Sequence, residues 1–356
     1  MAFSSFSLTF VSLLLISSFF LLSVSEAKSE SSHHLVKGLS WTFYKSKCPE
    51  VESIVRKHLK KVFKKDIGQA AGLLRLHFHD CFVLGCDASV LLDGSASGPS
   101  EQEQPPNLTL RAKAFEIIND LQALVQEHCD AVVSCADLVA LAARDSVFLS
   151  GGPDYRVPLG RRDSLSFATR EATLANLLPG TSNTSAVLDL LATKKLDATD
   201  AVALSGGHTI GIAHCSSFTN RLYPTQDPTM DETFAAELKS TCPESATDDA
   251  TTFDDISTPN LFDNKYFVNL VNRKGLFNSD QDLYMDSRTK DIVTSFAEDE
   301  ALFLEKFVHA MMKMGQLNVL TGKKGDVRTN CSALNSDTYL SSVVDGDDDD
   351  EQSSEL

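Results

Sequence analysis

Two polar residues of different chemical character stand four positions apart in a largely apolar stretch. Arg75 and His79 lie within Arg75-Leu-His-Phe-His-Asp-Cys81, and this spacing places both side chains on one face of a helix. A neutral imidazole can take a proton from one oxygen of a peroxide and return it to the departing oxygen, while a guanidinium stabilises the developing negative charge. Either residue alone would suit a surface arginine or a core histidine. Together they predict peroxide cleavage, with Phe78 limiting access on that side.

Oxygen-bearing residues follow this pair at once. Asp80, Asp87 and Ser89 carry side-chain oxygens, and Val83 and Gly85 can offer carbonyl oxygens. Alternate-residue spacing around a glycine-containing turn is typical of a calcium loop. A polar surface turn has the same composition, so the residues alone leave both interpretations open.

A histidine behind two glycines marks the second half of the chain. His208 follows Gly206-Gly207, where the missing side chains would let a flat cofactor approach closely. A histidine in this setting can equally be structural. Asp280, in isolation, has the features of an ordinary loop acid. A further group of oxygen-bearing side chains consists of Asp255, Thr258 and Asp263.

The cysteines indicate an oxidising compartment. There are eight: Cys48, Cys81, Cys86, Cys129, Cys135, Cys215, Cys242 and Cys331. An even number behind a secretory signal predicts disulfides, although spacing leaves roughly a hundred pairings open. A zinc site of His77, His79, Cys81 and Cys86 is an alternative that oxidation of the cysteines would disfavour. Sequons at Asn107, Asn183 and Asn330 fit a secretory route.

The two ends differ in composition from the middle. Residues 1–27 contain an uncharged apolar run and predict a cleaved secretory signal, with a retained membrane anchor as the alternative. Residues 341–356 hold seven acidic residues of a chain whose formal net charge is −17, and predict a disordered appendage, with a sorting signal as the alternative. The acidic balance argues against nucleic-acid binding. We expect residues 28–340 to form one domain that is monomeric and not membrane-bound.

Helical periodicity dominates the middle of the chain. Apolar residues recur at helical spacing over 51–65, 70–78, 115–125, 135–149 and 301–315. A further helix is expected over 197–205, with a capping box of Asp197 and Asp200 and an end at the paired glycines. Loops are expected at 93–106, 179–185 and 224–259. The pattern predicts a mostly α-helical protein.

Several motifs together resemble the secreted plant (class III) haem peroxidases over residues 38–335. These motifs are Arg75-Leu-His-Phe-His-Asp-Cys81, Val133-Ser-Cys-Ala-Asp137, Pro158-Leu-Gly-Arg-Arg-Asp163, Ser205-Gly-Gly-His-Thr209 and Phe262-Asp-Asn264. The resemblance implies a two-lobed helical fold with haem b between distal and proximal lobes. It also implies hydrogen peroxide and small aromatic, phenolic donors as substrates.

The resemblance assigns roles that spacing could not. Arg75 and His79 become the distal pair, and Asn107 resembles the asparagine that hydrogen-bonds the distal histidine. His208 becomes the axial ligand of the haem iron, with Phe78 beside the haem, and Asp280 resembles the carboxylate partner of the axial histidine. The lining of the donor-access channel is implied for Pro179, and a structural ion pair for Asp137 and Arg161.

Two calcium ions and four disulfides are implied in the same way. The first calcium would be held by Asp80, Val83, Gly85, Asp87 and Ser89, with Glu101 linking Asn107 to that site. The second would be held by Thr209, Asp255, Thr258 and Asp263. The implied disulfides are Cys48–Cys129, Cys81–Cys86, Cys135–Cys331 and Cys215–Cys242.

Four features depart from the commonest family pattern, and the first is the stretch Pro105-Pro-Asn-Leu-Thr-Leu-Arg111, which is one residue shorter. Tyr155 stands where many members have tryptophan, Asp254 stands where an apolar residue is commoner, and the acidic tail extends beyond the usual core. We expect a secreted, extracellular or vacuolar, peroxidase that removes peroxide while oxidising phenolic donors in one-electron steps. A catalytically silent, calcium-stabilised wall or recognition protein on the same scaffold is the alternative.

Overall fold

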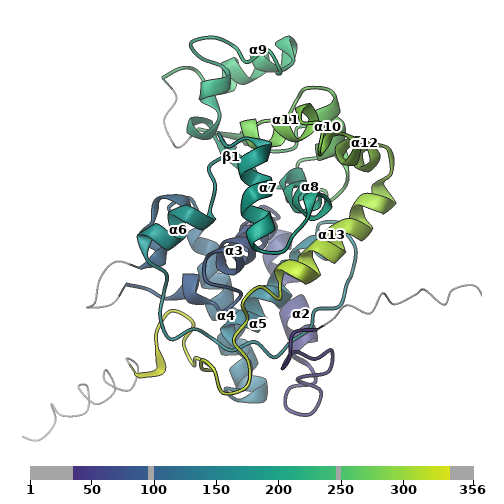
Figure 1. Cartoon of the computed structure of the whole chain (residues 1–356). Coiled ribbons are helices and arrows are strands. Elements are labelled where there is room, and N and C mark those ends of the chain that lie inside the picture. Colours follow the sequence, from purple (N-terminus) through teal and green to yellow (C-terminus); the bar gives the residue numbers. More distant parts are fainter. Residues whose placement is uncertain (1–34, 95–99, 246–249, 337–356) are drawn as a thin grey trace, which may run out of the picture. The chain divides into compact units, whose positions relative to one another are not determined.

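The computed structural model describes residues 35–94, 100–245 and 250–336 (Figure 1). The expected signal segment, residues 1–27, and the expected acidic tail, 341–356, lie outside these ranges. Within them, no helix combines the length and the apolar composition that crossing a membrane requires.

Helices make up most of the described chain, as the sequence predicts. In order they are α2 (Val51–Lys65), α3 (Gln69–Val83), α4 (Ala112–Cys129), α5 (Cys135–Leu149), α6 (Arg170–Asn176), α7 (Thr184–Thr193), α8 (Ala198–Ser205), α9 (Glu232–Thr241), α10 (Lys265–Val271), α11 (Asn278–Met285), α12 (Lys290–Glu298) and α13 (Glu300–Met314). The strands of the described residues form one antiparallel pair, β1 (Ile212–His214) with β2 (Thr251–Phe253), in which Ile212 lies opposite Phe253.

The helices fall into two groups according to the neighbours that they contact. Helices α2, α3, α4 and α5 pack on one another, with α3 against α5 as the most extensive pairing. Helices α7, α8 and α10 to α13 pack on one another in the same way, and α13 also contacts α3. Figure 1 shows the long α13 beside α8 and near α3. This grouping matches the expected two-lobed helical architecture.

Helix α3 carries the expected peroxide-cleaving pair and is longer than the sequence predicted. The expected helix ended at Phe78, whereas α3 continues to Val83. Asp80 does not interrupt it, because the Asp80 side chain accepts a hydrogen bond from the backbone N–H of Ala88, beyond the helix end (3.1 Å). The buried side chains of Phe82 and Val83 add further core contacts. His79 is therefore fixed inside a packed helix and not at a frayed end.

Other predicted helices are also longer in the structure, and the predicted loops contain short helices. The predicted helix 115–125 extends to Ala112–Cys129, and α7 already begins at Thr184, inside the predicted loop 179–185. The predicted loop 224–259 contains α9, whose first turn is capped by Asp231 accepting from the N–H of Phe234 (2.9 Å). The predicted loop 93–106 holds the 3-10 turn Glu101–Glu103 and leads into a second, Pro105–Asn107.

Helix α8 begins as the sequence predicts and leads into the second functional segment. Asp197 and Asp200 form the expected reciprocal capping box. The helix ends at Ser205, as predicted, but Gly206 and Gly207 do not begin a loop. Instead, Gly206–Thr209 continues as a 3-10 turn that carries His208.

Four disulfides close the chain on itself. The bonded pairs are Cys48–Cys129, Cys81–Cys86, Cys135–Cys331 and Cys215–Cys242. They are the pairs that the family resemblance implies, and they leave no free cysteine. The alternative zinc site is thereby excluded, because Cys81 and Cys86 are bonded to each other and offer no thiolate to a metal.

Candidate active site

Arg75 and His79 meet on one face of α3, as their spacing predicts. The Nε of Arg75 donates a hydrogen bond to His79 Nε2 over 3.1 Å. The guanidinium is also held from outside the helix, since it donates to the carbonyl oxygen of Thr109 (2.7 Å) and to that of Pro106 (3.2 Å). A permanent cation is therefore fixed beside the imidazole.

The opposite nitrogen of His79 is fixed by Asn107. His79 Nδ1 lies 2.6 Å from Asn107 Oδ1, and the Asn107 amide nitrogen donates to the Glu101 carbonyl oxygen over 2.8 Å. An amide oxygen can only accept, so His79 donates through Nδ1 and keeps a lone pair on Nε2. Burial, together with the smaller effect of the Arg75 charge, lowers the pKa of His79 to about 3. At neutral pH the side chain is an uncharged base whose accepting nitrogen lies beside Arg75.

Oxygen atoms without partners gather where α3 ends. Asp80 Oδ1, Ser89 Oγ and Glu101 Oε1 are buried and make no hydrogen bond within the described residues. The second Glu101 oxygen accepts from the N–H of Ala168 over 3.0 Å. Burial raises the pKa of Asp80 well above its usual value, and the nearby charge of Asp87 adds to this rise. Burial likewise raises the pKa of Glu101 to about 7.

The turn that follows supplies the remaining expected oxygens. Asp87 accepts from the N–H of Ser89 (3.1 Å), and the Gly85 carbonyl accepts from the N–H of Asp87 (2.8 Å). Gly85 has a φ of 144°, and an added Cβ would lie 2.8 Å from Asn318, so only glycine suits this position. Val83, the other residue expected to offer a carbonyl oxygen, is the last residue of α3. No described lysine or arginine forms an ion pair with Asp80, Asp87 or Glu101, although the charge of Arg328 acts to lower the pKa of both aspartates. These residues form a cluster of hard oxygen donors.

His208 is held by a carboxylate from a distant part of the chain. Its Nδ1 lies 2.9 Å from Asp280 Oδ1, and 42% of its side-chain surface is exposed. Burial disfavours the charged imidazole, but the charge of Asp280 and the hydrogen bond to it outweigh burial and raise the pKa of His208 to about 9. No described residue hydrogen-bonds its Nε2, so that nitrogen can bind a ligand once it has lost its proton.

The two glycines before His208 serve different needs. A Cβ on Gly206 would come within 2.5 Å of the Phe303 ring, so this glycine is required by core packing. A Cβ on Gly207 would meet only Leu74, at 3.7 Å. The space beside His208 is therefore open at Gly207, in keeping with the approach of a flat group.

Asp280 lies on α11 and not in a loop, which corrects the sequence interpretation. Its Oδ2 accepts from the N–H of Phe277 over 3.1 Å at the start of that helix. Its Oδ1 accepts a second hydrogen bond, from the hydroxyl of Tyr266 on α10, over 2.9 Å. Sequence reasoning missed Tyr266, although it stands two residues after the Phe262-Asp-Asn264 motif.

The second expected oxygen group also comes together. Thr209 Oγ1 lies 3.4 Å from Asp255 Oδ2 and 3.3 Å from Asp263 Oδ1, and the Thr258 hydroxyl donates to Asp263 over 2.9 Å. Burial raises the pKa of Asp255. Neither carboxylate forms an ion pair with a described lysine or arginine.

The unusual Asp254 lies close to the His208 segment. Its backbone N–H donates to the Gly211 carbonyl over 3.2 Å, and its Oδ1 is buried without a partner among the described residues. Burial raises the pKa of Asp254 to about 7, and the charge of His208 acts in the opposite direction.

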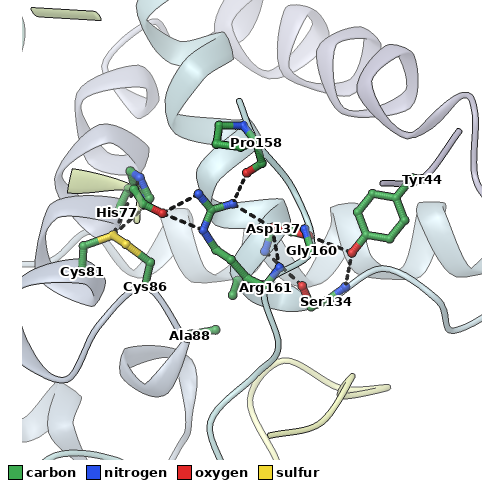
Figure 2. A network of polar contacts seen from close by, with 12 residues as sticks. Tyr44, His77, Cys81, Cys86, Ala88, Ser134, Asp137, Pro158, Gly160 and Arg161 are labelled. Atoms are coloured by element: carbon green, nitrogen blue, oxygen red, sulfur yellow. Dashed lines mark hydrogen bonds and ion pairs between the residues drawn. A yellow bond between two sulfur atoms is a disulfide. The ribbon is translucent and has the colours of Figure 1, made fainter. Parts of the chain in front are cut away.

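Asp137 and Arg161 form a buried structural pair, as the resemblance implies. Arg161 Nη1 donates to Asp137 over 2.8 Å and to the Pro158 carbonyl, while Asp137 also accepts from the Tyr44 hydroxyl over 2.8 Å (Figure 2). Figure 2 places this network beside His77, whose Nδ1 lies 3.5 Å from Cys81 Sγ of the Cys81–Cys86 disulfide. Arg161 also donates to the carbonyl oxygen of Gly315, the residue after α13, so the network ties α5 to the end of α13.

Two expected residues lie at the margin of the site. The Phe78 ring makes an edge contact with His79, with ring centroids 5.2 Å apart. Pro179 is exposed, and its carbonyl accepts from the N–H of Ser182 over 3.0 Å in the turn that precedes α7. Phe78 thus borders the distal pair, and Pro179 lies on the surface.

Comparison with known proteins identifies the family. The peroxidase family model matches residues 55–299. The chain is 62% identical over 322 residues to Peroxidase 12 of Arabidopsis thaliana, covering 90% of each chain. It is 59% identical over 302 residues to Cationic peroxidase SPC4 of Sorghum bicolor, covering 85% of this chain and 83% of the relative. It is 44% identical over 337 residues to Peroxidase 42 of Zea mays, covering 94% of this chain and 100% of the relative.

The chain therefore belongs to the peroxidase family, as a member of the plant class III enzymes, and it is an enzyme with peroxidase activity.

Proposed function

We propose that the protein is a haem peroxidase that reduces hydrogen peroxide to water and oxidises small phenolic donors in one-electron steps. The observation that carries this proposal is the uncharged, buried His79. Its Nδ1 is occupied by Asn107, and its Nε2 is the accepting nitrogen beside Arg75. This is the state that a base needs to take a proton from peroxide.

Haem b fits the proximal residues. His208 offers an Nε2 that no described residue uses, Gly207 leaves space beside it, and Asp280 accepts the Nδ1 proton. When bound, haem supplies the electrons that reduce the peroxide O–O bond. Asp280 orients the His208 ring and makes it a stronger electron donor.

The distal residues then have separate tasks. His79 takes the proton from one peroxide oxygen at Nε2 and returns it to the departing oxygen. Arg75 stabilises the negative charge that develops there. Asn107 keeps the imidazole in the required tautomer, and Phe78 restricts what can enter on its side.

Calcium fits both oxygen groups. At the end of α3, three buried oxygens lack partners and the carboxylates Asp80 and Asp87 have no ion-pair partner among the described residues. A divalent cation would satisfy these oxygens together with the carbonyls of Val83 and Gly85. Thr209, Asp255, Thr258 and Asp263 offer a second set of the same chemistry.

The donors, location and assembly belong to the same proposal. Small aromatic donors would reach the site past the exposed Pro179, so the site would accept several phenols and not one tailored substrate. Four disulfides, with no free cysteine among the described residues, support secretion to an oxidising compartment, extracellular or vacuolar. We propose a monomer that binds neither membrane nor nucleic acid.

The test against a catalytically silent scaffold protein is direct. Purified protein reconstituted with haem should show a Soret band and should colour guaiacol only when peroxide is added. The matched variant is His79→Ala, which should keep the Soret band and lose most of the colour. A protein that binds haem but forms no colour above the His79→Ala level would favour the silent alternative.

A further inference from the structure

Asp280 shares one oxygen between two donors. Its Oδ1 accepts from His208 Nδ1 and from the Tyr266 hydroxyl, each over 2.9 Å. Its Oδ2 accepts from the backbone N–H of Phe277 over 3.1 Å. The bond to Asp280 is the only hydrogen bond of the Tyr266 hydroxyl within the described residues. The phenol therefore competes with the imidazole for the same atom.

The setting makes this competition strong. Tyr266 and Asp280 are each only 3% exposed, and hydrogen bonds to a buried carboxylate are stronger than those between neutral groups in water. Tyr266 cannot lose its proton to relieve the competition, since burial and the charge of Asp280 raise the pKa of the phenol well above its usual value. It is therefore a hydrogen-bond donor at neutral pH.

The effect on His208 has a definite sign. Each donor to Asp280 spreads its negative charge and lowers its ability to draw the Nδ1 proton from His208. A ligand imidazole with a weaker acceptor is less anionic and stabilises ferric iron less. The Tyr266 phenol therefore acts against the carboxylate that orients His208.

We propose that Tyr266 is a positioning residue that, through Asp280, sets how strongly His208 stabilises oxidised iron. This inference rests on the proposed function, because it takes His208 to be the axial ligand. Tyr266 itself touches neither peroxide nor donor. Its role is to limit the electron donation that Asp280 confers on His208, so removing the hydroxyl and removing the carboxylate should have opposite effects.

The experiment compares Tyr266→Phe with the unchanged protein, both loaded with haem. Spectroelectrochemistry gives the ferric/ferrous reduction potential, and resonance Raman of the ferrous form gives the iron–histidine stretch. We expect the equilibrium to shift about tenfold toward ferric iron, which is about 59 mV for one electron. The stretching frequency should rise. Neither readout would move if Tyr266 only filled space.

The chain offers a matched control. The Tyr44 hydroxyl also donates to a buried carboxylate, Asp137, over 2.8 Å, and Tyr44 is also 3% exposed. Tyr44→Phe deletes the same atom in a comparable setting away from His208 and should leave the potential unchanged. Asp280→Asn removes the charge that both donors share and should raise the potential.

Each outcome separates the inference from the function on which it rests. A Tyr266→Phe potential equal to that of Tyr44→Phe, with Asp280→Asn raised, overturns the role of Tyr266 and leaves the proposed function standing. Loss of haem or fold in Tyr266→Phe, with Tyr44→Phe intact, assigns Tyr266 a purely structural role and also overturns the proposal. An unchanged potential in Asp280→Asn refutes the proximal assignment itself.

Discussion

Removing calcium from the group at the end of α3 should destabilise the protein increasingly as the pH rises. Glu101 is fully buried, and one of its oxygens has no partner in the described structure. Without a cation, burial raises its pKa from 4.5 to about 7. Below about pH 4.5 this group is protonated in both the folded and the unfolded chain and has no effect. Between pH 4.5 and about pH 7 the folded state binds more protons than the unfolded state, so the free energy of unfolding falls as the pH rises. Above about pH 7 the carboxyl group is charged in both states, and the full cost of burying that charge applies to the folded state.

The magnitude follows from the same two values. A difference of 7 minus 4.5 multiplied by about 1.36 kcal/mol gives a penalty of roughly 3 kcal/mol for the folded metal-free protein. Burial also raises the pKa of both Asp80 and Asp87, so these carboxylates act in the same direction. A bound cation removes the penalty by stabilising the charged carboxylates.

The assay is denaturant unfolding of calcium-loaded and chelated protein between pH 5 and pH 8, with metal analysis to verify removal. The gap in the free energy of unfolding should widen with pH. Glu101→Gln should remove much of that widening, whereas Glu103→Gln, an exposed acid two residues away, should not. A gap that stays constant across this range, or that narrows with pH, would refute the reasoning.

Three further predictions concern the site and the sequons. His79→Ala should slow peroxide cleavage by about 10²–10⁴-fold, the contribution of a positioned acid–base group, and stopped-flow traces showing less than a tenfold loss would contradict its role. His208→Ala should weaken haem retention, measured as loss of the Soret band on gel filtration, and undiminished retention would point to another ligand. Asn183 should carry glycan in protein from a secretory host because it is exposed, whereas Asn107 should not because both ends of its amide are engaged. Glycopeptide mass spectrometry giving the reverse pattern would contradict this.

Local spacing was enough to predict the distal pair but not the proximal one. Arg75 and His79 are four residues apart on one helix, so their contact follows from helical geometry alone. His208 and Asp280 are 72 residues apart and come from different elements, a 3-10 turn and α11. No periodicity connects them, and only the resemblance to a family paired them before the structure did.

The predicted helix boundaries were wrong for a related reason, namely that distant partners cannot be seen in the local sequence. The sequence interpretation ended this helix at Phe78, the last residue of the apolar pattern 70–78. In the structure Asp80 accepts a hydrogen bond from a backbone N–H beyond the helix, and the helix continues to Val83. In the predicted loop 224–259, Asp231 was an available cap signal for α9, but the flanking prolines and acids obscured it. The role of Tyr266 was not predicted, because a tyrosine on an apolar helix face is normally interpreted as a core residue. Only the structure shows that its hydroxyl donates to Asp280.

The distal base is fixed through two routes that end in the same oxygen group. One route is covalent, because Asp80 directly follows His79 on α3. The other passes from His79 through Asn107 to Glu101. Both Asp80 and Glu101 present an unpartnered buried oxygen, so one cation would hold both ends of the arrangement that aims the imidazole. The Cys81–Cys86 disulfide would limit how far the loop opens without that cation. Calcium at this position would therefore govern the alignment of His79 without contacting peroxide, and its loss would loosen the site before it unfolded the chain.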